Sequence, residues 1–556
     1  MNKKVCSFPI LFALLALLIG TCAVVFPASA QAAPTSTGSI TVSGTVARSY
    51  DAYQIFSANV VDGDSDAKIA TDFAWASDAA RDAVLPVLHS AGMPNSQTTA
   101  QEAAEWLNTD SHLTSALSAQ LARSLQSSGA EPVALNAGTA AELHCGYWLI
   151  VADDDAIAQG EAGTAPIMAL VGGSAVTVKP KAASPKAAKH VLEDSTAAWQ
   201  KAADATVADD LYWRLSATVP AGLTAYDTYT VQFVDTMSAG LDPSKVAASV
   251  RVYAAAGADG GFDAVQTDKD GRAGTEPAKG WTDITAQCAT KVAADGKTFT
   301  VRTGDLIAAL GGTDAFTAGA RVVAVYNAPL NSACNHGIAK GNPNEVYLRY
   351  PRSPFADQSG DAGFTHTPSD DACAYTWDLA LTKRGSDGDK PLAGAVLSIA
   401  DDRGRTLAAD GMWDAEGKAT VTTGEDGRVT VSGVDSGKLE VRELKAPKGY
   451  TAFEGTRSVT VKAEGLDVDQ VAAAKPKLTI TAESPLRADS ADGSTGSLEA
   501  SLINTPTGTP PSITTGGFMP STGDMAMYAA AAAAVAGAAL IVVALLVKRG
   551  GGSHKE

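Results

Sequence analysis

Alternating apolar and polar residues recur along much of the chain. Short runs of this kind, such as 39–46 and 229–234, are typical of strands that bury one face. Within the first third of the chain, apolar residues at helical spacing form the runs 79–88, 100–107 and 113–125. We therefore expect a mainly β protein whose first domain carries a helical insertion.

The strand-like runs group into three segments. We expect an N-terminal domain over residues 31–181, a middle domain over 182–371 and a C-terminal domain over 372–505. Turns rich in Gly, Asp and Asn separate the short strands, a pattern typical of β-sandwiches. The sequence therefore predicts tandem immunoglobulin-like β-sandwich domains. A Pro/Thr/Gly-rich stretch within 506–524 predicts an extended spacer.

The chain begins with a segment typical of exported proteins. Two lysines near the start precede an apolar run from about residue 8 to residue 26, and small residues follow it. This order predicts a secretory signal peptide over residues 1–30. We expect cleavage after Ala30, with Ala32 as the second choice.

A second apolar run, residues 525–547, lies near the other end of the chain. It carries no charge and is long enough to span a bilayer as a helix. Basic residues follow in the tail 548–556, which we therefore expect to stay in the cytoplasm. The body of the protein is expected outside the cell.

The charge balance is acidic, with 43 Lys and Arg against 61 Asp and Glu among 556 residues, a net charge of −18. Binding nucleic acid without regard to sequence needs a clustered excess of positive charge, so we expect no nucleic-acid partner. The seven histidines are scattered without metal-ligand spacing, and no hydrolase motif stands out. We therefore expect no metal, no cofactor and no enzymatic turnover.

Four cysteines remain once the signal peptide is removed, and export places them where disulfides can form. They are Cys145, Cys288, Cys334 and Cys373. Four cysteines allow three pairings, and the sequence alone does not choose among them. We favour Cys334 with Cys373 because these two flank one segment.

A short motif stands directly before the second apolar run. Its residues are Met519, Pro520, Ser521, Thr522 and Gly523. With the apolar span and basic tail behind it, the motif resembles the cell-wall sorting signal of Gram-positive surface proteins, which usually has Leu in place of the Met. The resemblance implies that a sortase cysteine attacks the bond after Thr522 and passes the acyl group to an amine. It leaves the class of sortase open.

A second family motif lies in the C-terminal segment. Residues 438–450 resemble the E-box of sortase-assembled pilins, with Glu443 at the position of its glutamate. Two further stretches, 377–395 and 502–504, resemble the opening and the closing strand of the collagen-binding-protein B-type domain. The resemblance implies that this segment is such a domain.

In that family a lysine and an asparagine on the first and last strands form an intramolecular isopeptide bond. The pair carried over is Lys383 with Asn504, and Glu443 is the helper. Burial in an apolar core can lower a lysine pKa by up to ~3–5 units, which frees the amine to act as a nucleophile. Burial also raises the pKa of a carboxyl group, which can then hold a proton and polarise the asparagine carbonyl.

The middle segment has a similar set of motifs. The run around Asp235 resembles the Asp-Thr-to-Gly-Leu motif of pilin middle domains, and the run that ends at Asn331 resembles their closing Tyr-x-Ala-x-Leu-Asn strand. The resemblance implies a bond between Lys189 and Asn331 with Asp235 as the helper. Lys186 is an alternative amine in a different register.

The first segment closes with residues 176–181, which resemble the pilin motif, although a lysine replaces its usual Tyr. The resemblance implies that Lys181 is the amine that attacks the acyl-sortase carrying Thr522 of another subunit. Lys186 and Lys189 lie nearby as alternatives.

Taken together, the motifs resemble a major shaft pilin of Gram-positive sortase-dependent fimbriae. The resemblance implies a structural subunit of an extracellular, wall-anchored fibre that is stiffened by internal isopeptide bonds. Sortase, identical subunits, accessory pilins and peptidoglycan are the implied partners, and the sequence does not reveal a host ligand. The alternative is a monomeric wall-anchored adhesin, or an accessory pilin at the tip or base of a fibre.

Overall fold

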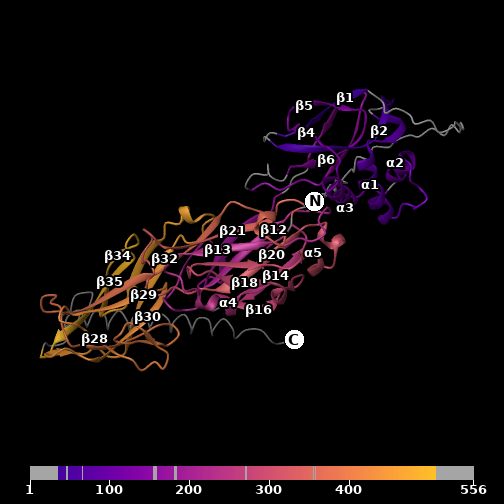
Figure 1. Cartoon of the computed structure of the whole chain (residues 1–556). Coiled ribbons are helices and arrows are strands. Elements are labelled where there is room, and N and C mark those ends of the chain that lie inside the picture. The colour runs from indigo at the N-terminus through magenta and orange to yellow at the C-terminus, as the bar shows by residue number, and fades with distance from the viewer. Residues whose placement is uncertain are drawn as a thin grey trace, which may run out of the picture.

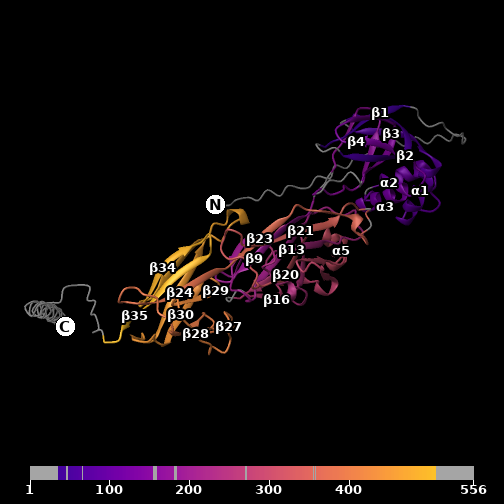
Figure 2. The ribbon, with the colours of Figure 1, turned by 60° about the vertical axis from the view of Figure 1, so that its left-hand side comes forward.

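The computed structural model describes residues 36–508, apart from 45–47, 65–66, 110, 154–159, 181–183, 269–271, 355 and 357. Within this range the chain forms three domains in a row, with the N-terminal and C-terminal domains at opposite ends (Figures 1 and 2). The predicted signal peptide, Lys181, the sorting motif and the apolar run 525–547 lie outside the described residues. Among the described helices, none is long and apolar enough to cross a membrane.

The N-terminal domain has two sheets. The larger runs β3–β2–β6–β7, and β4 also pairs with β2; the smaller runs β5–β1–β8. The strands of the larger sheet are β2 (Ser49–Asp62), β3 (Lys68–Trp75), β4 (Val133–Asn136), β6 (Gly146–Ala152) and β7 (Ile167–Val171). Those of the smaller sheet are β1 (Thr37–Val42), β5 (Ala140–His144) and β8 (Val176–Val178).

Three helices form the insertion that the apolar spacing predicts: α1 (Asp78–Ser90), α2 (Ala100–Leu107) and α3 (Ser115–Gln126). Each begins after a Ser or Thr whose side chain accepts a backbone N–H from the first turn. Before α2, Thr99 and Glu102 complete a reciprocal capping box. The apolar helix faces share one buried cluster with residues of β2 and β6, so the insertion packs on the larger sheet.

The middle domain is a sandwich of two sheets around the largest apolar core of the described residues. One sheet consists, in order, of β10 (Ala198–Gln200), β9 (Lys186–Glu193), β12 (Tyr212–Val219), β20 (Ala320–Asn327), β14 (Arg251–Ala256) and β17 (Thr282–Asp283). The other consists of β11 (Ala202–Asp204), β23 (Asp370–Tyr375), β21 (Asn342–Pro351), β13 (Gln232–Met237), β19 (Thr298–Arg302) and β18 (Ala289–Val292), with β22 (Phe364–His366) beside β21.

Small elements decorate this sandwich. They are the hairpin β15 (Val265–Thr267) and β16 (Ala273–Pro277), the helices α4 (Val246–Ser249), α5 (Leu306–Ala309) and α6 (Thr313–Phe316), and the 3₁₀ turns η3 (Pro243–Lys245), η4 (Thr285–Gln287) and η5 (Asp361–Gly363). None of them interrupts the two sheets.

The C-terminal domain is a second sandwich. Its first sheet is β29 (Arg428–Val434), β24 (Trp377–Gly385), β35 (Ser497–Pro506) and β31 (Tyr450–Thr451), with β34 (Leu486–Asp492) on β35. Its second is β27 (Trp413–Asp414), β26 (Thr406–Leu407), β25 (Val396–Ala400), β30 (Gly437–Lys445), β32 (Thr456–Glu464) and β33 (Lys477–Ala482), with β28 (Val421–Thr422) on β25 and η6 (Val471–Ala473) before β33. The first and last strands, β24 and β35, are parallel neighbours.

The border between the middle and C-terminal domains lies near residue 376 and not at 371/372. Residues 370–375 form β23, which pairs with β21 and β11 and so completes a sheet of the middle domain. Strand β24 begins at Trp377 in a different sheet. The predicted fold, mainly β with tandem sandwiches and a helical insertion in the first domain, is confirmed.

Candidate functional sites

A lysine, an asparagine and a glutamate meet in the core of the C-terminal domain. Lys383 lies on β24 and Asn504 on the parallel strand β35, while Glu443 comes from β30 in the opposite sheet. Asn504 Nδ2 donates to both carboxylate oxygens of Glu443, at 2.8 and 3.0 Å. Lys383 Nζ donates to the carbonyl of Leu502 at 3.1 Å and lies 3.8 Å from Glu443 Oε1. The structure thus brings together the three residues that the motifs single out.

The strand pattern explains why this lysine is buried. Along β24, Trp377, Leu379, Leu381 and Lys383 alternate inward, so a charged residue takes a position that otherwise belongs to the apolar core. The Lys383 side chain has no exposed surface. Burial lowers the pKa of Lys383 to about 8, against the opposing effect of Glu443. An appreciable fraction of the amine is therefore unprotonated near neutral pH.

A second polar cluster lies between the two sheets of the middle domain. Nζ of Lys189, on β9, contacts the Asp235 carboxylate on β13 and donates to Tyr326 Oη at 2.9 Å. Tyr326, on β20, donates to Asp235 Oδ2 at 3.0 Å and accepts from Asn344 Nδ2, on β21, at 2.8 Å. All four side chains are fully buried. The phenol oxygen is thus the meeting point of the lysine, the carboxyl group and the amide.

The structure does not bring Asn331 to Lys189. Asn331 follows β20 in a loop, where its Nδ2 donates to the carbonyls of Ala239 and Leu241 at 2.9 and 3.0 Å. These bonds hold it on the neighbouring turn and away from the core. Asn344, and not Asn331, takes part in the buried cluster of Lys189, Asp235 and Tyr326.

A signal for Asn344 was present in the strand pattern. Residues along β21 alternate, and Asn344 takes an inward position in line with Val346, Leu348 and Tyr350. Burying an amide on an apolar face is costly unless hydrogen bonds satisfy it, so an asparagine at such a position marks a specific role. Tyr326 was part of the closing motif, but sequence reasoning gave it no role.

The pKa directions in the middle cluster favour a neutral amine beside a protonated acid. Burial lowers the pKa of Lys189 to about 8, against the opposing effect of Asp235. Burial also raises the pKa of Asp235, against the opposing effect of Lys189. Asp235 Oδ1 and Asn344 Oδ1 are buried without a hydrogen-bond partner among the described residues. If Asp235 is protonated, its carboxyl O–H supplies a hydrogen-bond donor beside these two buried oxygens.

The predicted Cys334–Cys373 disulfide is not present, because the four cysteines of the described residues are free thiols. Cys373 is buried on β23, with its sulfur against the backbone of Gly341. Cys334 lies in a loop whose backbone packs against Gly240. Burial raises the pKa of the Cys373 thiol to about 11.

The lysines considered as intermolecular acceptors differ in their exposure to solvent. Lys181 lies outside the described residues, in the connection between β8 and β9. Lys186 opens β9 with an exposed side chain, whereas Lys189 is fully buried. A buried amine cannot meet an enzyme and a second subunit, so Lys189 is excluded as the intermolecular acceptor.

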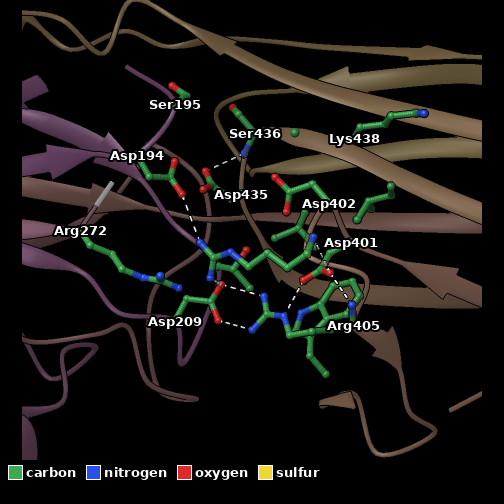
Figure 3. Close-up of a pocket in the computed structure, with 16 residues that line it drawn as sticks. Asp194, Ser195, Asp209, Arg272, Asp401, Asp402, Arg405, Asp435, Ser436 and Lys438 are labelled. Carbon is green, nitrogen blue, oxygen red and sulfur yellow. Dashed lines mark hydrogen bonds and ion pairs between the residues drawn. The ribbon is translucent and has the colours of Figure 1, made fainter. Parts of the chain in front are cut away.

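A third group of polar side chains lies at the joint between the middle and C-terminal domains. It lines a cavity of about 570 Å³ (Figure 3). Arg405 of the C-terminal domain contacts both oxygens of Asp209 in the middle domain, with Nη2 at 2.8 Å. Arg403 donates to Asp209 at 2.7 Å and lies 3.5 Å from Asp194. These ion pairs tie the two domains together.

Carboxyl groups also crowd this joint. Glu193, Asp194 and Asp204 of the middle domain lie near Asp435 of the C-terminal domain. Burial, reinforced by Asp204, raises the pKa of Glu193 to about 8, and the same two causes raise the pKa of Asp435 well above its usual range. Trp377 Nε1 donates to Asp204 Oδ2 at 2.6 Å. Among the described residues, no group of side chains is arranged to hold a metal ion. The raised pKa values of Glu193 and Asp435 favour protonated carboxyl groups in the joint.

Residues 378–475 match the family model described as SpaA, a prealbumin-like fold domain. We refer to the C-terminal domain, most of which this match covers, as the SpaA domain. The match falls on the sandwich that holds Lys383 and Glu443, the part of the chain where the pilin motifs are most specific.

A relative in sequence supports the same resemblance. The chain is 30% identical over 143 residues to the trypsin-resistant surface T6 protein of Streptococcus pyogenes serotype M6. The match covers 24% of this chain and 24% of that protein, so it spans about a quarter of the relative's length. With the SpaA domain, it confirms the predicted resemblance to Gram-positive backbone pilins.

Solved structures of such pilins are distant matches. The T6 backbone pilin of Streptococcus pyogenes serotype M6 aligns over 86% of this chain and 100% of its own, with 17% identity and a TM-score of 0.46. The major pilin SpaD of Corynebacterium diphtheriae aligns over 86% of this chain and 100% of its own, with 14% identity and a TM-score of 0.42.

Proposed function

We propose that this chain is the shaft subunit of a covalent cell-surface fibre, in which a sortase joins Thr522 of one subunit to Lys181 of the next. The observation that carries the proposal is the buried cluster of Lys383, Glu443 and Asn504 within the SpaA domain. An ion pair taken out of water is expensive and contributes little net stability by itself. A lysine buried beside an amide is better explained by a covalent bond between the two.

The chemistry needs only the side chains of the cluster. The neutral Lys383 amine attacks Cγ of Asn504, an Nζ–Cγ bond forms, and the Cγ–Nδ2 bond breaks with loss of one ammonia. Glu443 contacts the amide nitrogen and lies near the amine, so it can move the required protons. Each domain reacts once, so the chain consumes no substrate and acts as a structural protein.

The middle cluster supports a second bond of the same kind, between Lys189 and Asn344 with Asp235 as the helper. Its lysine and carboxyl group have pKa shifts in the directions that the reaction needs. Strands β9 and β21 lie in different sheets, so the bond would link the two sheets covalently across the core. The proposal therefore keeps Lys189 and Asp235 and replaces Asn331 with Asn344.

The position of the Lys383–Asn504 bond suits a fibre under tension. A load enters each domain at its first strand and leaves at its last, and β24 and β35 are the first and last strands of the SpaA domain. A bond between Lys383 and Asn504 would carry the load between those strands without stretching the sheets. The acidic composition and the proposed export and wall anchoring fit the same role.

Separation of cell-wall extracts on a denaturing gel tests the intermolecular linkage. The wild-type chain is expected to give a ladder of covalent multimers, and Lys181→Ala is expected to collapse it to monomer. Lys186→Ala, a change to an exposed lysine close by, is the matched control and should leave the ladder intact. A wild-type extract with only monomer would overturn the shaft proposal and favour a monomeric adhesin or accessory pilin.

A further inference from the structure

Tyr326 is the only side chain in the described middle-domain cluster that reaches both nitrogens of the proposed reaction. Its Oη accepts from Lys189 Nζ at 2.9 Å and from Asn344 Nδ2 at 2.8 Å, and it donates to Asp235 Oδ2 at 3.0 Å. The phenol therefore uses both its lone pairs and its proton within the cluster. Its ring is fixed by an edge-to-face contact with Phe299, with ring centroids 4.8 Å apart.

The strand register explains why a bridging group is needed here. Asp235 pairs with Val346 across β13 and β21, while Asn344 pairs with Met237. Asp235 and Asn344 are thus diagonal neighbours on one face, with Cα atoms about 7–8 Å apart in such an arrangement. An aspartate is too short to serve the lysine and also reach the amide nitrogen across this diagonal.

In the SpaA domain, the helper acid reaches the amide nitrogen without a bridging group. Its helper is a glutamate, one methylene longer, and Glu443 accepts from Asn504 Nδ2 directly. No tyrosine hydroxyl is recorded in contact with Lys383, Glu443 or Asn504 among the described residues. One carboxyl group therefore faces both nitrogens in the SpaA domain, whereas a carboxyl group and a phenol share the task in the middle domain.

We infer that Tyr326 is a catalytic proton relay for the Lys189–Asn344 crosslink, an inference that rests on the proposed function. The phenol passes a proton from the attacking Lys189 nitrogen to the departing Asn344 nitrogen. Asp235 takes the other proton that the lysine must lose.

The protons balance along this route. The protonated lysine carries three hydrogens and the amide nitrogen two. In the products one hydrogen stays on the new amide, one is on Asp235 and three leave as ammonia. Tyr326 takes one hydrogen from Nζ and gives its own to Nδ2, so it ends as a neutral phenol. Burial and the nearby Asp235 raise the pKa of Tyr326 well above its usual range, which disfavours a lasting phenolate.

Substitution of the phenol by Phe removes the relay and keeps the ring. The full chain is produced in a short pulse of cell-free synthesis, and loss of ammonia at each site is followed by intact mass and peptide mapping. General acid–base catalysis is typically worth about 10²–10⁴-fold, so we expect Tyr326→Phe to slow the Lys189–Asn344 bond about 100-fold. The Lys383–Asn504 bond in the same molecules should form at the wild-type rate.

Two further variants separate a relay from a packing role. Tyr253→Phe deletes another buried middle-domain hydroxyl, which donates to the carbonyl of Thr275 and touches none of the cluster, so it should leave the rate unchanged. Asp235→Glu combined with Tyr326→Phe should restore at least a tenth of the wild-type rate, because the longer acid can reach Asn344 as Glu443 reaches Asn504.

The outcomes distinguish the two levels of the proposal. If wild-type chains never lose ammonia at Lys189 and Asn344, the proposed middle-domain crosslink is wrong. If they do, and Tyr326→Phe reacts at the wild-type rate, the relay is wrong. A slow Tyr326→Phe variant that the added glutamate fails to rescue would also overturn the relay and show that the hydroxyl only supports packing.

Discussion

The middle domain and the SpaA domain place the same kinds of groups in their cores by different routes. In the SpaA domain, Glu443 contacts the amide of Asn504 directly. In the middle domain the shorter Asp235 meets Lys189, and the hydroxyl of Tyr326 connects both to the amide. The comparison teaches that the reach of the helper acid decides how many other groups the site needs.

The pKa values of the two lysines are nevertheless shifted in the same way. Burial lowers the pKa of Lys189 and of Lys383 to about 8, and in each case a nearby carboxyl group opposes the shift. Both lysines take inward positions of a strand, in line with Ala187 and Val191 on β9 and with Leu379 and Leu381 on β24. Strand alternation therefore buries the lysine in both domains, whereas the groups that contact the amide differ between them.

The largest expected effect is loss of a crosslink. Lys383→Met keeps an unbranched apolar stem but removes the amine, so the SpaA domain should lose its bond. In the chain-entropy treatment of disulfides, a crosslink that closes a loop on the order of 100 residues contributes about 5 kcal/mol. We expect a comparable drop in the free energy of unfolding, measured by calorimetry. Lys438→Met, at an exposed lysine of the same domain, is the control, and an equal loss there would contradict this explanation.

Exchanging the helper acids tests the comparison of their reach. Glu443→Asp should slow formation of the Lys383–Asn504 bond by about 10²-fold or more, since no tyrosine hydroxyl among the described residues bonds to this site and could replace the lost reach. Asp235→Glu should leave the Lys189–Asn344 bond within about tenfold of the wild-type rate, because the relay remains in place. Pulse synthesis followed by peptide mapping measures both rates. Equal sensitivity of the two sites would show that reach does not distinguish them.

A smaller effect is expected at the joint between the two domains as the pH rises. The pKa of Glu193 is raised from its ordinary 4.5 to about 8, so the folded joint binds protons more tightly than the unfolded chain does. The stabilisation is complete below about pH 4.5 and is lost as the pH rises through about 8. The pKa of Asp435 is raised in the same direction. Hydrogen exchange at the Ser436 amide, which donates to Asp204, should therefore accelerate from pH 6 to pH 9 beyond the intrinsic rate.

The joint prediction has its own control. Asp435→Asn removes one of the crowded acids and should flatten the pH dependence, while the Arg403 and Arg405 contacts to Asp209 persist. An exchange rate at Ser436 that follows the intrinsic rate at every pH, in wild type and variant alike, would refute the description of protonated carboxyl groups in the joint.

The smallest expected effect concerns the ion pairs across the joint. Arg405→Ala removes the two-point contact with Asp209, which is partly exposed to solvent, so we expect a loss of only about 1 kcal/mol in the free energy of unfolding. Arg487→Ala, which removes a more exposed pair with Asp489, should cost less. Denaturant titration measures both, and a larger cost for Arg487→Ala would contradict the ranking.

The sequence was sufficient for features that depend on local pattern. Alternation predicted the strands, and apolar residues at helical spacing predicted the insertion within about two residues of its observed bounds. Lys383, Glu443 and Asn504 could be named because two motifs and a closing strand bracket one small domain. The sequence did not separate the end of β23 from the start of β24, because apolar residues occupy both ends and only Thr376 lies between them.

The sequence was insufficient where strand pairing between distant parts of the chain decides which side chains meet. Asn331 and Asn344 both follow β20, and a motif that ends in Asn drew attention to the nearer one. Which amide enters the core depends on the register of β21 against β13, which joins residues more than 100 positions apart. The predicted pairing of Cys334 with Cys373 rested on their order along the chain, and both are free thiols in the structure.

Intact-mass analysis of the exported body, followed by peptide mapping, tests the central claim most directly. The account predicts a mass lower than that of the sequence by two ammonia molecules, with branched peptides that join Lys189 to Asn344 and Lys383 to Asn504. A mass equal to that of the unmodified sequence, or a branched peptide that joins Lys189 to Asn331, would contradict it.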